Sequence, residues 1–524
     1  MQALAPDDLH VASRLLGLVR KELVRPEQAL LPDDEAFRFR HILIRDAAYE
    51  ALPKVTRAEL HERFAGWLEQ RGGDLVELDE ILGYHLEQAC RYLRELGLDE
   101  PRALELADRA RERLASGGRA ALARDDARAA TTLLARSAEL LEPGDPRRGA
   151  ALVDVAEARF QADDLYEARQ VAEQALEIAR VFGDERVEAL ARIVWISAST
   201  QIDPTATAEA ALAEIEELAL VVARFHDDDG LAKAQALRSL LLFFLGRTAQ
   251  ALEGYQSAAE TARRARNVRT EVRALAAAIA AQTHGATPVA EAVQSTEHAL
   301  ERATDPTARS FISQKRARLE AMRGDFEAAR MFYDQSKQLA LEYGLRLRRG
   351  VQTQDGAAIE LAAGDPVAAE RELREGYDVL AELGETGFRS TVASHLADAL
   401  FAQGRLEEAA RAADDAIELA QEDDFDPIAR ARVVQARIAL ERGDLEAATA
   451  LAESAVALEE QTDYIERHAD TLMALARVRE AAGDIAEAAV AAQKALELYE
   501  RKGHVVSAAR ARALLDELGL AGLV

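Results

Sequence analysis

The sequence predicts an all-α protein: a superhelical solenoid of about ten helical hairpins of ~40 residues each, preceded by a small segment of another kind. Hydrophobic residues make up 49% of the chain but aromatic residues only 5%, so the apolar content is mostly Ala and Leu, which favour helices. Only 12 prolines interrupt 524 residues. A chain of this length exceeds a single compact core, whereas a repeat array grows along one axis.

The period is carried by a short motif, a glycine followed by Asp or Arg and then by a run rich in Glu and Ala. Clear copies begin at Gly324, Gly364, Gly404, Gly443 and Gly483, which are 40, 40, 39 and 40 residues apart. Alanine stands seven residues before and five residues after each of these glycines. The ten alanines are Ala317, Ala357, Ala397, Ala436 and Ala476 on the first side, and Ala329, Ala369, Ala409, Ala448 and Ala488 on the second.

This arrangement is typical of two antiparallel helices in close contact. Helices approach to about 8–10 Å where small side chains face the partner backbone. The glycine suits the C-terminus of the first helix, and the Asp after it can cap the second. Weaker copies begin at Asp125, Asp163, Gly246 and Val289. We therefore expect hairpins throughout residues 118–518, with residues 507–518 as a closing helix.

The pattern of small residues resembles tetratricopeptide repeats, in which one small residue recurs on the first helix and two on the second. The last of these positions is filled by Ala175, Ala258, Ala299, Ala416, Ala455 and Ala495. The period is longer than the family's usual 34 residues, and such longer repeats are similar to the sensor arrays of bacterial signalling ATPases. HEAT and armadillo arrays have a comparable period, but the turn motif argues against them.

The first 117 residues lack this period. Residues 37–69 are rich in Arg, His and aromatic residues, and Pro53 separates two amphipathic patterns within them. Gly72 and Gly73 form a natural break before a further helical pattern. Helices are expected over residues 42–52, 60–68 and 80–92.

Three stretches of this region, residues 39–49, 60–63 and 83–89, resemble the segment that joins the nucleotide-binding core to the repeats in signal-transduction ATPases with numerous domains (STAND). The region also resembles that of bacterial chains in which an adenylate/guanylate cyclase precedes an AAA-type ATPase and a tetratricopeptide tail. The resemblance implies a partial winged-helix-like segment at residues 1–73, with one helix over residues 8–25, a helical linker at 74–117 and the solenoid at 118–524. It also implies that His41, followed by Arg45, contacts the phosphates of a bound nucleotide.

The chain departs from that family because it contains no Gly-x-x-x-x-Gly-Lys-Ser/Thr phosphate-binding loop and no cyclase domain. We therefore expect no enzymatic activity, no catalytic residues and no cofactor in this chain. ATP or ADP would be bound by a domain N-terminal to it, and Met1 is expected to lie inside the winged-helix element. No nucleophile or zinc-protease motif occurs either.

Composition excludes several other classes of function. The net charge of −28 opposes binding to nucleic acid or to anionic lipid surfaces. A single cysteine, Cys90, excludes an internal disulfide framework, and the lack of a leader pattern favours the cytoplasm. No apolar run approaches the ~20 residues that span a bilayer. His85 and Cys90 lack the partners of a metal site, and the acidic runs at 226–230 and 422–427 are expected to be helix-to-helix turns.

Function is expected on the concave face, which the first helices of the hairpins line. The positions predicted to point inward are Gln314, Arg318, Gln354, Asp398, Arg437, Asp470 and Arg477. Such residues could bind a protein or a peptide, although any one of them could equally be a solvated surface residue. The preferred hypothesis is a non-catalytic regulatory and protein-interaction module, the sensor and scaffold tail of a STAND ATPase, with an ATPase or cyclase domain as partner in cis or in trans.

Two alternatives remain open at this point. The chain could be a free-standing scaffold that assembles protein complexes, or the sensor part of a transcriptional regulator. The second alternative lacks a basic recognition helix, because the sequence ends at Val524 without one.

Overall fold

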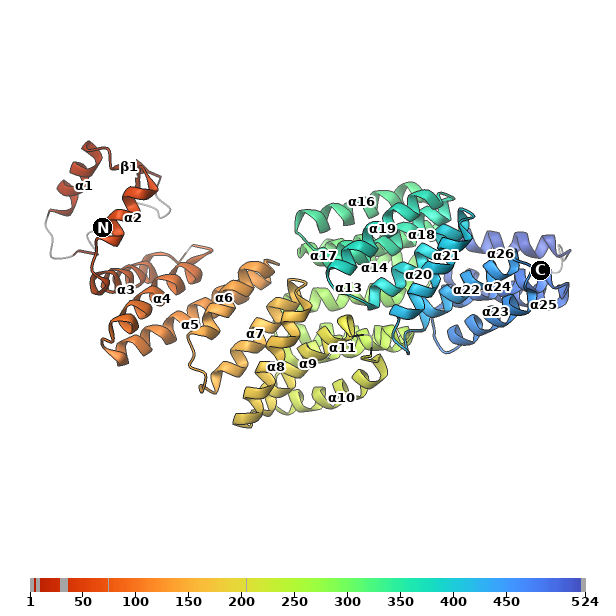
Figure 1. The fold of residues 1–524 in the computed structure, drawn as a ribbon, viewed down its shortest axis with the longest axis horizontal. Coiled ribbons are helices and arrows are strands. Elements are labelled where there is room, and N and C mark those ends of the chain that lie inside the picture. The colour runs from red at the N-terminus through yellow and green to blue at the C-terminus, as the bar shows by residue number, and fades with distance from the viewer. Residues whose placement is uncertain (1–3, 6–9, 29–35, 74, 204, 520–524) are drawn as a thin grey trace. The chain divides into compact units, whose positions relative to one another are not determined.

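The computed structural model describes residues 4–5, 10–28, 36–73, 75–203 and 205–519. Within them the protein is helical apart from a single antiparallel ribbon of two strands, β1 (Val24–Glu27) and β2 (Ala36–Phe39). The chain divides into two compact units, residues 1–158 and 159–524 (Figure 1). The prediction of an all-α, tetratricopeptide-like repeat fold is confirmed.

Unit 1 begins with a helix, the β1–β2 ribbon and a second helix. Its helices are α1 (Val11–Arg20), α2 (Ile42–Glu50), α3 (Lys54–Arg71), α4 (Leu78–Leu96), α5 (Glu100–Ala123), α6 (Ala127–Glu139) and most of α7 (Arg147–Gln161). The predicted breaks at Pro53 and at Gly72 lie between helices, as expected. Helix α5 runs continuously through position 118, at which the sequence placed the start of the solenoid.

The prediction of one helix over residues 8–25 is wrong at its C-terminal end. Helix α1 ends at Arg20, and Glu22 has a positive φ of 57°, which a helix cannot continue through. Val24 then pairs with Phe39 in the ribbon. Pro26 lacks an amide hydrogen and is disfavoured inside a helix, which is the physical reason for the earlier stop. Asp8 lies outside the described residues.

Unit 2 is a series of antiparallel helical hairpins (Figure 1). Its helices are α8 (Leu165–Phe182), α9 (Glu185–Ile202), α10 (Ala208–Arg224), α11 (Asp228–Phe244), α12 (Thr248–Arg264), α13 (Val268–His284), α14 (Val289–Arg302), α15 (Pro306–Arg323), α16 (Phe326–Glu342), α17 (Arg346–Val351), α18 (Thr353–Ala363), α19 (Pro366–Glu382), α20 (Gly387–Ala402), α21 (Leu406–Leu419), α22 (Phe425–Glu441), α23 (Leu445–Glu459), α24 (Ile465–Ala481), α25 (Ile485–Lys502) and α26 (Val505–Glu517). Eight hairpins run from α9–α10 to α24–α25, with α17 and α18 together forming one first helix. The predicted closing helix is α26.

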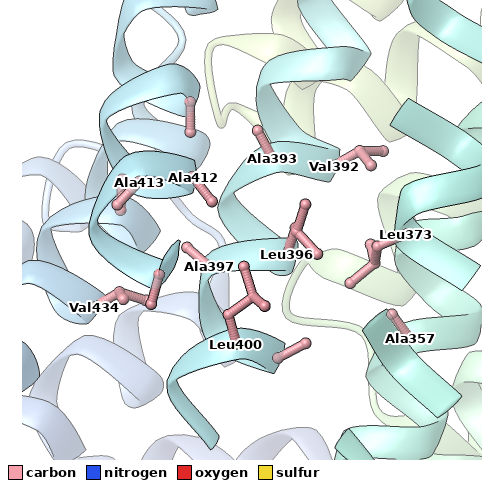
Figure 2. Close-up of a cluster of buried hydrophobic side chains, with 14 of the residues drawn as sticks. Ala357, Leu373, Val392, Ala393, Leu396, Ala397, Leu400, Ala412, Ala413 and Val434 are labelled. Atoms are coloured by element: carbon pink, nitrogen blue, oxygen red, sulfur yellow. The ribbon is translucent and has the colours of Figure 1, made fainter. Parts of the chain in front are cut away.

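The alanines of the repeat motif form the seams between helices. All ten of them are fully buried, and Figure 2 shows Ala397 and Ala413 at the seam between α20 and α21. The five motif glycines have positive φ values between 75° and 87° where the first helices end. Asp325, Asp365 and Asp444 each accept a hydrogen bond from the amide three residues on, at the start of the next helix. The predictions that the motif glycine ends the first helix and that the Asp after it caps the second are therefore confirmed.

The turns between repeats also cap helices that lie five repeats earlier. Asp463 accepts hydrogen bonds from the amides of Thr248, at 2.7 Å, and Ala249, at 2.9 Å, at the start of α12. Asp423, one period before Asp463, accepts a hydrogen bond of 2.8 Å from the amide of Glu209 in α10. These acids therefore join segments 214 and 215 residues apart. Successive turns of the superhelix pack directly against one another.

Lys502 makes the same kind of connection at the end of α25. Its Nζ is fully buried and donates to the carbonyl oxygens of Gln282, Gly285 and Thr287 at 2.7, 2.9 and 2.7 Å. These carbonyls belong to the segment that links α13 to α14, about 220 residues earlier in the chain. Contacts between turns therefore hold distant repeats together, and unit 2 contains cavities.

Candidate ligand-binding cavities

Among the residues described, unit 2 contains cavities, two of which are lined by many of its inner side chains. The larger one, about 370 Å³, is called here the aromatic cavity because Phe243, Phe244, Phe311, Phe388 and Tyr464 line it. The smaller one, about 270 Å³, is called the charged cavity. Asp426 and Arg467 line both.

The walls of the aromatic cavity come mainly from first helices, including α11, α13, α15, α17, α18, α20 and α24. Its rings meet across large distances in the sequence. The ring centroids of Phe243 and Tyr464 are 5.7 Å apart, and so are those of Phe244 and Phe388. A molecule in this cavity would therefore touch repeats from different turns of the superhelix.

Arg348, on the short helix α17, is the most unusual side chain of this wall. Its guanidinium lies 4.4 Å from the centroid of Phe311, and its Nη1 donates to the side-chain oxygen of Gln314 at 3.3 Å. Its Nε is buried without a hydrogen-bond partner, and it forms no ion pair within the described part of the chain. Burial lowers the pKa of Arg348 to about 10. The acids Asp163, Asp355 and Asp305 favour its charged form, but none of them forms a direct ion pair with it.

Next to Arg348, a buried polar cluster holds α15 against α18. Lys315 Nζ lies 2.7 Å from an Asp355 carboxylate oxygen, which also accepts a hydrogen bond of 2.6 Å from Gln314. Gln314 was predicted to point into the groove, and it is fully buried in this cluster. Gln354, another predicted groove residue, does line the aromatic cavity.

Acidic side chains occupy another part of the same wall. Glu385 accepts hydrogen bonds from the amides of Phe388 and Arg389, at 2.9 and 3.1 Å, while burial raises its pKa to about 7. Asp424 precedes α22 but does not cap it. The side chain of Asp424 forms no hydrogen bond or ion pair with any residue that the structure describes. Burial, and then the neighbouring Asp426, raise the pKa of Asp424 well above its ordinary value.

The charged cavity brings together four of the predicted groove residues: Arg318, Asp398, Arg437 and Asp470. The Asp398 carboxylate lies 3.0 Å from Arg437 and 3.5 Å from Arg430. The Tyr499 hydroxyl donates to Asp470. Most of these charged groups therefore form ion pairs or hydrogen bonds within the protein.

Arg318 pairs across the superhelix with Glu466 of α24, 148 residues away, at 2.6 Å. His504 Nε2 lies 3.3 Å from the same carboxylate oxygen. Burial alone would raise the pKa of Glu466, but Arg318 and His504 outweigh it and hold that pKa well below its ordinary value. This ion pair therefore joins two distant repeats of the superhelix.

The remaining predicted positions lie outside both cavities. Arg477 is exposed and pairs with Glu480 at 3.0 Å and with Glu517 at 2.6 Å. His41 caps α2, its Nδ1 accepting from the amide of Leu43 at 3.3 Å, and its side chain is exposed. Arg45, also exposed, pairs with Asp46 at 2.6 Å. The assignment of His41 and Arg45 to nucleotide binding stays a prediction.

Unit 1 contains a hydrogen-bonded chain that the sequence did not predict. The Tyr49 hydroxyl lies 2.7 Å from His61 Nε2 and 2.9 Å from the Tyr92 hydroxyl, and His61 Nδ1 lies 2.7 Å from His85 Nδ1. Burial lowers the pKa of His61 and that of His85 to about 4. Tyr49, His61 and His85 each come from a different one of the three stretches that carried the STAND resemblance. That shared origin is the signal that could have brought them together.

Across the described ranges, no group of three or more His, Cys, Asp or Glu side chains is placed to hold a metal ion. Cys90 is buried in the core of unit 1, and burial raises the pKa of its thiol. Among the helices described, none is long and apolar enough to cross a membrane.

No protein-family model matches the chain, and no curated protein matches its sequence. Solved structures with a similar fold include a Rap protein in complex with Competence and Sporulation Factor, at 13% identity and a TM-score of 0.39, which covers 72% of this chain and 99% of its own. Yeast Tom70 has 14% identity and a TM-score of 0.35, with 84% and 97% covered. A STAND protein with a tetratricopeptide repeat sensor from Pyrococcus horikoshii has 15% identity and a TM-score of 0.34, with 88% and 59% covered.

Proposed function

We propose that this chain is a non-catalytic sensing module that holds a small ligand inside its superhelix. The observation that carries the proposal is the aromatic cavity, whose wall contains a buried cation, Arg348, and a carboxyl group, Asp424, that have no ion-pair partner among the described residues. Charged groups that lack a direct ion-pair partner away from bulk water cost stability, so their persistence beside a cavity is typical of a binding site.

The position of the cavity gives a mechanism for sensing. Its wall includes Phe243 of α11, Phe311 of α15, Phe388 of α20 and Tyr464, which belong to repeats joined by contacts between superhelical turns. A ligand that touches all of them favours the closed superhelix over any more open form, because it binds the closed form better. The length of the superhelix then reports whether ligand is bound.

The finer part of the proposal is that this sensor serves a STAND-type signalling ATPase, in some chains linked to a nucleotide cyclase. Its support is the set of three sequence stretches in unit 1, whose residues pack together there. In this proposal His41 and Arg45 contact ATP or ADP held by a separate nucleotide-binding domain, in cis or in trans, and the protein works in the cytoplasm. The outer surfaces of the solenoid remain free to bind a protein or peptide partner.

A cavity-filling variant tests the sensing proposal. In wild-type protein, a screen of small metabolites by thermal shift should find ligands that raise the midpoint of unfolding. Ala277→Phe places a ring in the aromatic cavity and should abolish that rise. Val268→Phe is the matched control, because Val268 is exposed on the same helix α13 and outside the cavity. Ligands that stabilise wild type and Ala277→Phe equally would contradict the proposal.

A second experiment tests the ATPase link. The purified chain alone should not bind ADP in a calorimetric titration. An ADP-loaded nucleotide-binding domain of a STAND ATPase, supplied in trans, should bind the chain, and His41→Ala should weaken that binding. Arg38→Ala, a change at a nearby exposed position on β2, is the control. Tight ADP binding by the chain alone, or equal binding by His41→Ala, would count against this part of the proposal.

A further inference from the structure

Nearly every charged group of the aromatic cavity has a partner within the protein. Those with partners are Lys315 with Asp355 at 2.7 Å, Arg467 with Asp426 at 2.9 Å, Arg273 with Asp305 at 3.1 Å, Asp163 with the Leu347 amide at 2.8 Å, and Glu385 with the Phe388 amide at 2.9 Å. Within the described residues, Arg348 forms no ion pair and donates only to the uncharged Gln314 side chain, at 3.3 Å, and the Asp424 carboxyl forms neither an ion pair nor a hydrogen bond. Their charges are opposite.

Each of these two side chains prefers a particular chemical group as its binding partner. A guanidinium binds a carboxylate through two parallel hydrogen bonds, and the Nε of Arg348, which such a fork would use, has no partner in the protein. A carboxylate such as Asp424 accepts hydrogen bonds from an ammonium group. A ligand that carried only an anion would leave Asp424 without a partner, and one that carried only a cation would do the same to Arg348.

Between these polar groups the wall is apolar. Phe243, Phe244, Phe311 and Phe388 present ring surface to the cavity. Its volume, about 370 Å³, lies at the lower end of the range of small-molecule sites, roughly 300–1,000 Å³. The space therefore suits a compact molecule with an apolar body and excludes a folded protein segment.

We propose that the aromatic cavity binds a zwitterion with an apolar body, of the class of apolar amino acids and dipeptides with free termini. Arg348 binds the ligand's carboxylate, Asp424 binds its ammonium group, and the phenylalanine rings surround its side chains. This inference rests on the proposed sensing function and specifies the ligand class of the same cavity.

The proposal predicts a change of protonation on binding. Burial and the neighbouring Asp426 raise the pKa of Asp424 well above its ordinary value in the free protein. An ammonium group beside it favours the ionised form. Binding should therefore lower the pKa of Asp424, and the proton released as a result makes the heat measured by calorimetry depend on the ionisation enthalpy of the buffer.

The test uses the full chain and isothermal titration calorimetry with L-phenylalanine, the dipeptide Leu-Phe, N-acetyl-Leu-Phe and Leu-Phe amide. At least one of the two free zwitterions should bind. Each blocked form of the dipeptide should bind at least about tenfold more weakly than Leu-Phe, because it leaves one buried charge without a partner. If neither zwitterion binds, or if N-acetyl-Leu-Phe binds as well as Leu-Phe, the zwitterion assignment is wrong.

Two variants should each weaken the binding of a different pair of the three dipeptides. Side chains that only stabilised the fold would not separate the dipeptides in this way. Arg348→Gln should weaken binding of Leu-Phe and of N-acetyl-Leu-Phe but not of Leu-Phe amide. Asp424→Asn should weaken binding of Leu-Phe and of the amide but not of the acetylated form. Arg346→Gln and Glu422→Gln, at exposed positions two residues away, are the matched controls and should change none of these affinities. Equal losses for all three dipeptides would overturn the assignment of the two ends.

Failure of this inference is distinguishable from failure of the sensing function. If the zwitterions do not bind but another metabolite stabilises wild type and not Ala277→Phe, the ligand class is wrong and the sensing function stands. If no metabolite separates wild type from Ala277→Phe, both fail.

Discussion

Two neighbouring positions of the same repeat behave in opposite ways. The position seven residues before each motif glycine is Ala317, Ala357, Ala397, Ala436 and Ala476, and all five are fully buried at a seam. The next position holds Arg318, Ala358, Asp398, Arg437 and Arg477. Arg318 is buried against a residue 148 positions away, whereas Arg477 is exposed. The seam position makes the same contact in each repeat, but the inner position contacts a different part of the superhelix in each.

The difference shows which contacts follow from the repeat itself. A seam joins two helices of one hairpin or adjacent hairpins, so the repeat geometry alone fixes its neighbours. An inner side chain meets whatever the previous or next superhelical turn places opposite it. The contacts at the seams therefore determine the repeat fold. The side chains of the inner wall determine what differs from one repeat to the next.

The largest effect should come from breaking a contact between distant repeats. Arg318→Met leaves Glu466 buried with only His504 beside it, and we expect a loss of about 3–5 kcal/mol in the free energy of unfolding. Arg477→Met, at the same repeat position, removes an exposed ion pair and should cost about 0–1 kcal/mol. Urea unfolding monitored by circular dichroism measures both. Equal losses would show that the inner position is as uniform as the seam.

A smaller effect should depend on pH. Burial, and then Asp426, raise the pKa of Glu459 in the charged cavity to about 7. The folded state thus keeps a proton that the unfolded state loses between about pH 4.5 and 7, so stability falls as the pH rises through this window. Glu459→Gln should match wild type near pH 4.5 and exceed it at pH 8 by up to about 3 kcal/mol. Exposed Glu460→Gln is the control, and a gain that is the same at both pH values would contradict the prediction.

The next largest loss of stability should come from placing a larger side chain at a seam between helices. Ala397→Leu forces α20 away from α21 and should cost about 1–3 kcal/mol. Ala381→Leu, on the exposed surface of α19, should cost almost nothing. Thermal unfolding of both variants measures the difference. Because each seam has the same geometry, Ala357→Leu should resemble Ala397→Leu closely, and a wide spread between them would weaken the comparison.

The smallest effect should distinguish local from remote helix caps. Asp444→Ala and Asp463→Ala each remove a cap and should each cost about 1 kcal/mol. Asp444 caps its own helix α23, so faster hydrogen exchange should stay near residues 445–448. Asp463 caps α12, so exchange should rise at Thr248 and Ala249, 215 residues away in sequence. Faster exchange confined to the turn around Asp463 would contradict packing between turns.

Part of the candidate site could be read from the sequence. Arg318, Asp398, Arg437 and Asp470 were predicted to face inward and do line the charged cavity, and Gln354 lines the aromatic one. Arg348, Asp424 and the phenylalanines were not predicted, because they lie outside the regular inner positions of the repeat. Arg348 belongs to the short helix α17, and Asp424 lies in a turn.

The sequence by itself determined the hairpin, its period and its seams, because these depend on contacts between residues at most one repeat apart. Small side chains, a glycine with positive φ and a capping acid act locally and can be recognised locally. Tertiary structure alone decided that successive turns touch, that two cavities lie among the inner side chains, and that Arg348 and Asp424 form no ion pair there. The small rotation between neighbouring repeats accumulates over about five of them, and no single motif encodes that sum.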